Sequence, residues 1–462
     1  MLLSHLVSVL VVILVVVHDI VAVVRMTASS SSLLSSSSSF VTALTPISAL
    51  ASPPIQQVIN VVLITGSTDG IGETTARNIL LSPHTNNQNS DTNANNKIVV
   101  LIHGRDENRI RSTTESLLQA IQKQRKNNNK KKNNNSHQEE TEAEVEENEV
   151  IALPASDLAT MRGCYELADN VKQALIKGSD DDVTGPTTKK MQLQILMNNA
   201  GVFSQELIRT EDGLEVTFAV NVVAPFIVTS MLLSSLLVCD TTTTSTIQKK
   251  TKTKKGDEED TDDASSTTPD PNEAGGSPRR SSRIVIASSV SQSWKLSNEY
   301  WEDLHYTQRP YSAHTAYSDS KLLDAMLTME MAHRLQVIHA ESNTNTNTNT
   351  NDDRGRNTRI TCNCLDPGTV NTKMLLDGWG RIGIDVRTAL DETWCCTNAA
   401  LETVSGQYYV GRTPRHASEE AYDIHQRTKL WHVLSQLAPE AAHAWDAAIA
   451  PYTAVSSSSS SS

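Results

Sequence analysis

The chain has 462 residues and a formal net charge of −13, and its basic residues stand in short runs, such as 130–132 and 249–255, close to acidic ones. This distribution excludes the broad basic face on which nucleic-acid-binding domains hold phosphates, so we expect no nucleic-acid partner. The six cysteines include no Cys-x-x-Cys pair and match no zinc spacing, so we expect no metal site.

Residues 1–57 are predicted to be a leader rather than part of the fold. Residues 6–17 are almost wholly apolar, and this run has the length of the hydrophobic part of a signal peptide. With the apolar stretch 20–24 it could just span a bilayer, and Arg25 behind a retained anchor would favour a cytosolic catalytic domain. A Ser-rich stretch without acidic residues follows as far as Asp69, as in transit peptides. We therefore expect membrane association or organelle targeting, with the endoplasmic reticulum and the plastid both open.

Long stretches of Ser, Thr, Asn, Lys, Asp and Glu cannot bury a core and are predicted to be disordered insertions. They lie near 85–96, 126–149, 178–190, 240–282 and 342–357. Without them, the leader and a C-terminal tail at 441–462, about 275 residues remain, which suits one domain. We assign that single domain to residues 58–440.

Strand-like and helix-like segments alternate between the insertions. Strands are predicted at 58–65, 97–103, 150–154, 193–197, 283–287 and 359–365. Helices are predicted at 73–81, 107–124, 161–176, 211–237 and 317–337. Strands that alternate with helices indicate an α/β fold with a doubly wound parallel sheet, here expected to have seven strands.

The first predicted strand ends in the glycine-rich turn T-G-S-T-D-G-I-G. Gly66, Gly70 and Gly72 would let the backbone turn sharply and approach a pyrophosphate at the N-terminus of the next helix. The turn therefore predicts a dinucleotide site. Its expected cofactor contacts are Thr65, Gly66, Ser67, Asp69, Gly70, Ile71 and Gly72.

The second predicted strand leads into His103-Gly104-Arg105-Asp106. A fold that prefers NAD usually has a carboxylate at this strand end, whereas an Arg can pair with the 2′-phosphate of NADP. Gly104 takes the expected acidic position and Arg105 follows it. We therefore expect NADP(H) as the cofactor, with NAD(H) as the alternative because of Asp106.

Tyr317 and Lys321 stand four residues apart, on one face of a predicted helix. A nearby ammonium lowers the pKa of a phenol, and a tyrosine so tuned can pass a proton to or from a substrate oxygen. The preceding strand ends in Ser288-Ser289. This arrangement predicts acid/base chemistry on an alcohol or carbonyl.

Taken together, these motifs resemble the short-chain dehydrogenase/reductase family from about residue 58 to about residue 435. The shared motifs are the turn at 65–72, N-N-A-G at 198–201, Tyr-x-x-x-Lys at 317–321 and P-G-x-x-x-T at 367–372. The resemblance implies a Rossmann-type fold and a catalytic tetrad of Asn221, Ser289, Tyr317 and Lys321.

The resemblance also implies a role for each member of the tetrad. Tyr317 would be the acid/base, and Ser289 would hydrogen-bond the substrate oxygen. Lys321 would bind the nicotinamide ribose and tune Tyr317, and Asn221 would hold a water in a proton relay. Further cofactor contacts would come from Asp157, Leu158, Asn199, Ala200, Gly201, Tyr317, Lys321, Pro367, Gly368 and Thr372.

Shorter similarities point to the retinol dehydrogenase and WW-domain oxidoreductase-like branch of this family. They are Glu302-Asp303-Leu304, Ser320-Lys321-Leu322, Ser405-Gly406-Gln407-Tyr408 and Leu430-Trp431. The branch implies NADP(H)-dependent chemistry on a small lipophilic, retinol-like alcohol or carbonyl, and the family implies a homo-oligomer. Residues 373–396 carry apolar side chains that would roof the substrate pocket. Asp69 departs from the branch, which often has a small or polar neutral residue there.

Three alternative hypotheses remain at this point. A protochlorophyllide-reductase-like enzyme shares much of the pattern and would suit a plastid leader, although Ser289 and the cysteine set argue against it. A non-catalytic dinucleotide-sensing scaffold would have no need of the Tyr317–Lys321 pair. The low-complexity insertions could instead be partner-binding elements, with the enzyme activity secondary.

Overall fold

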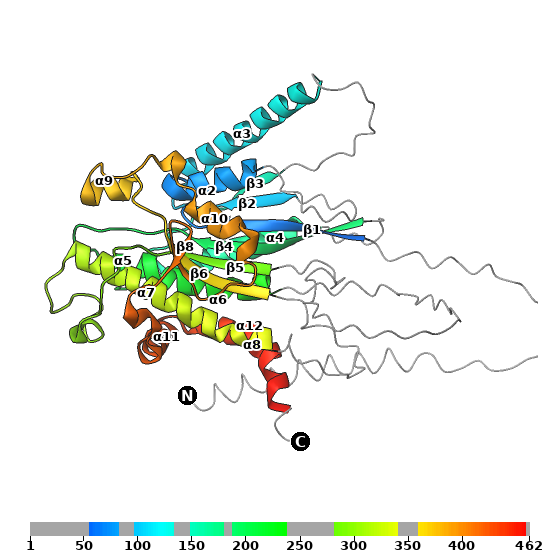
Figure 1. Cartoon of the computed structure of the whole chain (residues 1–462). Helices are drawn as coiled ribbons and strands as arrows, with labels where there is room; N and C mark the ends of the chain where they lie inside the picture. Colours follow the sequence, from blue (N-terminus) through cyan, green and yellow to red (C-terminus); the bar gives the residue numbers. More distant parts are fainter. Residues whose placement is uncertain are drawn as a thin grey trace, which may run out of the picture. The chain divides into compact units, whose positions relative to one another are not determined.

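The computed structural model describes residues 55–82, 97–133, 148–179, 187–237, 281–340 and 359–458 (Figure 1). Residues 1–54, which include the predicted targeting segment, lie outside the described residues. The predicted leader boundary at 57 is wrong by three residues, because 55–57 belong to the first strand. The predicted insertion near 85–96 and nearly all of those near 240–282 and 342–357 lie outside the described residues as well.

The described residues form an eight-stranded sheet in the order β3-β2-β1-β4-β5-β6-β7-β8. The strands are β1 Ile55–Ile64, β2 Ile98–Ile102, β3 Glu149–Ala152, β4 Thr187–Asn198, β5 Ser281–Ala287, β6 Arg359–Asp366, β7 Tyr408–Val410 and β8 Thr413–Arg415. The first seven strands in this order pair in parallel, as predicted. An eighth strand, β8, was not predicted and pairs antiparallel with β7. Gly411 and Arg412 between them have φ of 55° and 64°, the left-handed values that a two-residue hairpin requires.

Helices cover both faces of the sheet (Figure 1). Their bounds are α2 Gly70–Leu81, α3 Glu107–Asn133, α4 Met161–Lys177, α5 Val216–Phe218, α6 Ala224–Leu236, α7 Ala313–Arg334, α8 Gln336–Ala340, α9 Lys373–Trp379, α10 Asp391–Thr397, α11 Ile424–Leu437 and α12 Pro439–Ser458. The central strand β1 is buried on both sides: Val61 and Leu63 pack under α4 and α6, while Val62 and Ile64 pack under α2 and α10. A strand buried on both faces reads as a continuous apolar run, which is why the sequence revealed it. The doubly wound Rossmann-type fold is confirmed.

The predicted helix at 211–237 begins later than expected and is not continuous. The carboxylate of Glu215 accepts hydrogen bonds from the backbone N–H groups of Thr217 and Phe218, both at 2.8 Å, so it caps the helix. A single wide turn, η1 Ala219–Val223, then separates α5 from α6. Among the described residues, Val216–Leu236 is long and apolar enough to cross a membrane, but it is mostly buried in this domain.

Two predicted insertions partly belong to regular elements. Helix α3 continues to Asn133, and β4 begins at Thr187, inside the segments predicted as insertions. The polar residues 187–190 pair with the first residues of β1, which extends the sheet beyond its apolar core. Their polar composition carried no strand signal, so the sequence analysis missed them.

The C-terminal boundary predicted at 440 falls inside helix α12. Ala441 and Trp445 of this helix are fully buried, and the Trp445 ring packs edge-on against Trp431 with centroids 5.0 Å apart. The helix packs against α6, so it covers one face of the core. The segment predicted as a tail is therefore largely an integral helix, with its last four residues outside the described part of the chain.

Candidate active site

The strand order reverses between β1 and β4, and a cleft of about 730 Å³ opens there at the carboxyl ends of the strands. Ligands of open α/β sheets bind at such a switch point, because the two neighbouring loops diverge to opposite faces. Most of the predicted site residues line this cleft. They are Gly66, Asp69, Gly70, Ile71, Arg105, Asp157, Leu158, Asn199, Ala200, Gly201, Ser289, Tyr317, Lys321, Pro367, Gly368 and Thr372.

Three residues of the glycine-rich turn stand behind the cleft and shape it. The Thr65 hydroxyl accepts hydrogen bonds from the N–H groups of Asn199 and Ala200, both at 3.0 Å, and so joins the ends of β1 and β4. The Ser67 hydroxyl accepts from His103 N–H at 3.0 Å and joins the turn to β2. A Cβ on Gly72 would lie 2.4 Å from the Asn199 amide nitrogen, so helix α2 can approach the turn only with glycine here.

Asp69 places a carboxylate at the N-terminus of α2, where a pyrophosphate is expected. Its Oδ1 accepts from Gly70 N–H at 2.8 Å, and Oδ2 pairs with Lys373 and lies 4.0 Å from Arg109. Burial alone would raise the pKa of Asp69, but the Lys373 ammonium and the Gly70 N–H outweigh it and lower that pKa. Lys373 and Arg109 therefore offset the negative charge of Asp69, the residue at which this turn departs from the family pattern.

The end of the cleft beside β2 carries two arginines. Arg105 is exposed there, and Arg109, which the sequence analysis missed, lines the same cleft from the first turn of α3. Asp106 was the reason to keep NAD(H) as the alternative cofactor. Its Oδ1 accepts a hydrogen bond from Arg109 N–H at 2.9 Å, as a helix-capping residue does. The arrangement therefore presents guanidinium groups with no carboxylate at the Gly104 position.

His103, directly after β2, connects the segments that form this end of the cleft. It is buried, and burial lowers its pKa to about 4, so its ring is neutral at physiological pH. Nδ1 accepts from Gly66 N–H at 3.0 Å, which leaves Nε2 to donate to the Ser156 carbonyl at 3.2 Å. His103 thus fixes the turn relative to the segment that carries Asp157.

Three tetrad residues converge at the other end of the cleft. Tyr317 on α7, Lys321 one turn further along this helix and Ser289 just after β5 all line the cleft, and the Lys321 ammonium lies 5.6 Å from the centre of the Tyr317 ring. Burial raises the pKa of Tyr317, Lys321 lowers it, and the carboxylates of Asp324 and Asp366 raise it again, so the net direction is upward. The charge of Lys321 lowers the pKa of Tyr317, as predicted, but the effects that raise this pKa are larger.

Asn221, the fourth member of the predicted tetrad, is held by hydrogen bonds within the protein. Its Oδ1 accepts from Val202 N–H at 2.8 Å, and its Nδ2 donates to the Val202 carbonyl at 3.1 Å and to the Ser320 hydroxyl at 2.9 Å. The side chain is buried in the wide turn η1 and does not line the cleft. Among described contacts, it ties the loop after β4 to helix α7 next to Lys321.

Two buried carboxyl groups in the cleft were missed. Asp366, the last residue of β6, accepts hydrogen bonds from Val290 N–H at 3.0 Å and Gly368 N–H at 3.1 Å. Glu392 on α10 accepts from the Thr75 hydroxyl at 3.1 Å, and burial raises its pKa to about 8. Asp366 could have been found from the sequence, because it lies between a predicted strand and the Pro-Gly pair. Nothing in the sequence around Glu392 indicated that it would lie in the cleft.

The roof predicted at 373–396 is present as helix α9 and the segment after it. Met374, Leu375, Trp379 and Ile382 line the cleft, while no residue of α9 is fully buried, so this helix does not serve as core packing. The Trp379 ring lies 5.5 Å from the Tyr317 ring, with Phe203 4.5 Å and His314 5.1 Å from Trp379. An aromatic group thus stands beside the phenol of Tyr317.

No family model matches the chain. Among curated proteins, it is 25% identical over 242 residues to retinol dehydrogenase 14 of Homo sapiens, which covers 52% of this chain and 57% of that protein. It is 24% identical over 264 residues to retinol dehydrogenase 13 of Mus musculus, covering 57% and 65%. The chain therefore spans less than two thirds of the length of these two relatives. Polyprenol dehydrogenase of Homo sapiens is 23% identical over 385 residues, covering 80% of this chain and 82% of that protein.

Solved structures are more distant in sequence. An uncharacterised protein of Mycobacterium paratuberculosis has a TM-score of 0.47 at 17% identity, covering 84% of this chain and 96% of that one. The landomycin C-6 ketoreductase LanV, solved with NADP and rabelomycin, has a TM-score of 0.41 at 15% identity, covering 78% and 97%. The chain thus carries motifs that resemble those of the short-chain dehydrogenase/reductase family, has a doubly wound sheet and is similar in sequence to retinol and polyprenol dehydrogenases.

Proposed function

We propose that this protein is an NADP(H)-dependent oxidoreductase that interconverts an alcohol and a carbonyl on a lipophilic, retinol-like substrate. The observation that carries the proposal is the convergence of Tyr317, Ser289 and Lys321 at one end of the cleft at the sheet's switch point. A dinucleotide-sized cleft with an acid/base tyrosine beside it suits hydride chemistry better than binding alone.

The residues at the cleft suit a bound NADP(H). The positive φ of Gly66 and Gly70, at 65° and 60°, bends the turn so that its backbone can approach phosphates. Arg105 and Arg109 would hold the 2′-phosphate, and Asp157 and Leu158 would lie near the adenine. On the opposite side, the nicotinamide half would lie along 199–201 and the Pro367–Thr372 segment, where Lys321 would bind its ribose.

Proton movement in the proposed reaction depends on Tyr317. In carbonyl reduction, the substrate oxygen accepts hydrogen bonds from Tyr317 and Ser289, and the Tyr317 hydroxyl gives up its proton to that oxygen. A nicotinamide held along 199–201 and the Pro367–Thr372 segment would supply the hydride to the carbonyl carbon in this direction and would receive it in the other. In alcohol oxidation, the Tyr317 phenolate takes the hydroxyl proton. The product of reduction thus gains one hydride and one proton.

The apolar roof favours a lipophilic substrate. Met374, Leu375, Trp379 and Ile382 would face the substrate beside the Tyr317 phenol. Relatives named for retinol and polyprenol, two lipophilic alcohols, support the same substrate class. A membrane location, in the endoplasmic reticulum or the plastid, would give such an enzyme access to its substrate and accords with the apolar segment 6–17.

The test is cofactor binding and turnover by the purified full chain. NADPH and NADH are titrated separately, and all-trans-retinal, a polyprenol-derived aldehyde and simple aldehydes are then screened. Tyr317→Phe should abolish turnover, while Tyr409→Phe, which removes a phenol hydroxyl outside the cleft, should leave it unchanged. NADPH binding without turnover on any carbonyl would favour the sensing scaffold, and light-dependent turnover of protochlorophyllide would favour that alternative. Failure to bind either cofactor would refute the proposal.

A further inference from the structure

A buried ion pair joins Lys321 of the tetrad to Asp324, a residue that belongs to none of the motifs. The Lys321 ammonium donates to Asp324 Oδ2 and to the Ala287 carbonyl, both at 2.8 Å. Lys321 is 4% exposed and Asp324 is 1% exposed, so the charges of both are removed from water. An ammonium has three N–H donors, and these two contacts leave one for the cleft that Lys321 lines.

The ionisable groups around Lys321 come from three elements. Asp324 and Tyr317 share its helix α7, Glu392 faces it from α10, and Cys364 faces it from β6. Burial raises the pKa of Glu392 to about 8 and that of Cys364 to about 12, so both are mainly neutral near neutral pH. Asp324 is therefore the main counter-charge for the ammonium.

The pKa of Lys321 shows the effect of the Asp324 carboxylate. Burial acts to lower the pKa of Lys321, but the charge and hydrogen bond of Asp324 outweigh it, and the pKa is raised. Burial also raises the pKa of Asp324 to about 7 against the pull of Lys321, so the pair is ionised above neutrality. A lysine left in this place without its carboxylate would lose its proton at a much lower pH.

We propose that Asp324 is a positioning residue that keeps Lys321 protonated and turned so that its free N–H faces the cofactor cleft. The inference rests on the proposed function, in which Lys321 binds the ribose diol of a nicotinamide nucleotide. A protonated ammonium binds two hydroxyl oxygens more strongly than a neutral amine does, because its hydrogen bonds are charge-assisted.

The test is the pH dependence of NADPH affinity, measured by the fluorescence of the nucleotide between about pH 7.5 and 9.5, where the 2′-phosphate and arginines do not titrate. Every chain compared, the reference called wild type included, carries Glu392→Gln, because the Glu392 carboxyl lines the same cleft and its pKa of about 8 falls in this range. In Asp324→Asn the side chain keeps its size and an acceptor for Lys321 but loses the charge. The dissociation constant of this variant should rise by about tenfold across the range as Lys321 loses its proton, whereas the wild-type value should change by less than about twofold.

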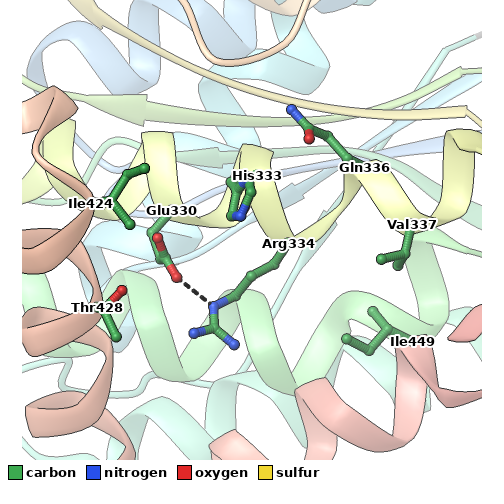
Figure 2. A pocket seen from close by; sticks show the side chains of 8 residues that line it. All are labelled: Glu330, His333, Arg334, Gln336, Val337, Ile424, Thr428 and Ile449. Carbon is green, nitrogen blue, oxygen red and sulfur yellow. Dashed lines mark hydrogen bonds and ion pairs between the residues drawn. The ribbon is translucent and has the colours of Figure 1, made fainter.

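The matched control is Glu330→Gln on the same helix. Glu330 is also a buried carboxylate paired with a cation, Arg334 at 2.8 Å, but the pair lines a separate cavity of about 460 Å³ between α7, α11 and α12 (Figure 2). This variant should show the flat wild-type profile. It thereby separates the effect on Lys321 from the general effect of neutralising a buried carboxylate in α7.

Each result has one interpretation. A flat profile in Asp324→Asn, or a loss of affinity that is equal at every pH, would overturn the proposal, since equal loss indicates only a structural role. If Asp324→Asn does not fold, the wild-type profile still tests the proposal. A wild-type affinity that falls by about tenfold as the pH rises from about 7.5 to 9 would mean that Lys321 is not held protonated. A wild type that binds neither NADPH nor NADH would refute the proposed function itself.

Discussion

Replacing Glu392 by Gln should flatten the pH dependence of the stability of this protein. Glu392 is 1% exposed, and within the described residues only its Oε2 has a partner, the Thr75 hydroxyl at 3.1 Å. Burial raises its pKa from 4.5 to about 8. A carboxyl whose pKa is higher in the folded state is tolerated best when protonated, so its contribution is complete below pH 4.5 and is lost as the pH rises toward 8.

The size of the effect follows from the two pKa values. Integrating the linkage relation for one group from pH 5 to pH 8 gives a loss of about 3 kcal/mol in the free energy of unfolding. That value is an upper bound, because water entering the cleft would lower the cost of charging Glu392. The glutamine variant keeps an acceptor for Thr75 and cannot ionise, so this loss should be absent.

Urea unfolding followed by tryptophan fluorescence at pH 5 and pH 8 provides the measurement. The difference between the two pH values should be smaller in Glu392→Gln than in the wild type by about 3 kcal/mol or somewhat less. Glu330→Gln serves as the control, because the Glu330 carboxylate faces Arg334 and Arg427 and its charge is compensated. If the wild type and Glu392→Gln lose stability equally between the two pH values, the charging of Glu392 does not cost what its burial implies.

Three further outcomes are expected. Tyr317→Phe should reduce turnover by about 10²-fold or more while changing NADPH affinity far less in fluorescence titration, since the main role of the phenol is to give the proton. Arg105→Ala should reduce the ratio of NADPH to NADH affinity by about tenfold, because a charge-assisted pair with the 2′-phosphate is lost. Arg109→Ala should change this ratio in the same direction. Equal losses of affinity for both cofactors would count against the assignment of these arginines to the 2′-phosphate. Trp445→Ala should lower the free energy of unfolding by about 3–5 kcal/mol in urea titration, because it empties a fully buried site between α6 and α11.

Local chemistry explains which features could be predicted from the sequence. The glycine-rich turn was recognisable because three glycines at fixed spacing are needed wherever the backbone must turn and pack as closely as Gly72 does against Asn199. Tyr317 and Lys321 were recognisable because one helix sets their separation. The buried strands were recognisable from continuous apolar runs such as Val61–Ile64.

Other features depend on partners that are distant in the chain. The polar residues 187–190 become a strand only because β1 extends beside them, and helix α12 becomes part of the core only because Trp445 meets Trp431. Asp324 and Glu392 look like ordinary helix carboxylates until the fold buries one beside Lys321 and the other against Thr75. No periodicity in the sequence carries that information.

The surroundings of Tyr317 show what such tertiary contacts change. Spacing alone predicts a phenol whose pKa is lowered by Lys321, but the fold buries Tyr317 and adds the carboxylates of Asp324 and Asp366, and its pKa is raised instead. The Asp324 carboxylate, 2.8 Å from the Lys321 ammonium, opposes part of the effect of that ammonium on the pKa of the phenol. Tyr317 is therefore protonated at neutral pH, the form that donates to a carbonyl oxygen. In the proposed reaction, reduction should proceed at neutral pH, whereas alcohol oxidation, which needs the phenolate, should accelerate as the pH rises.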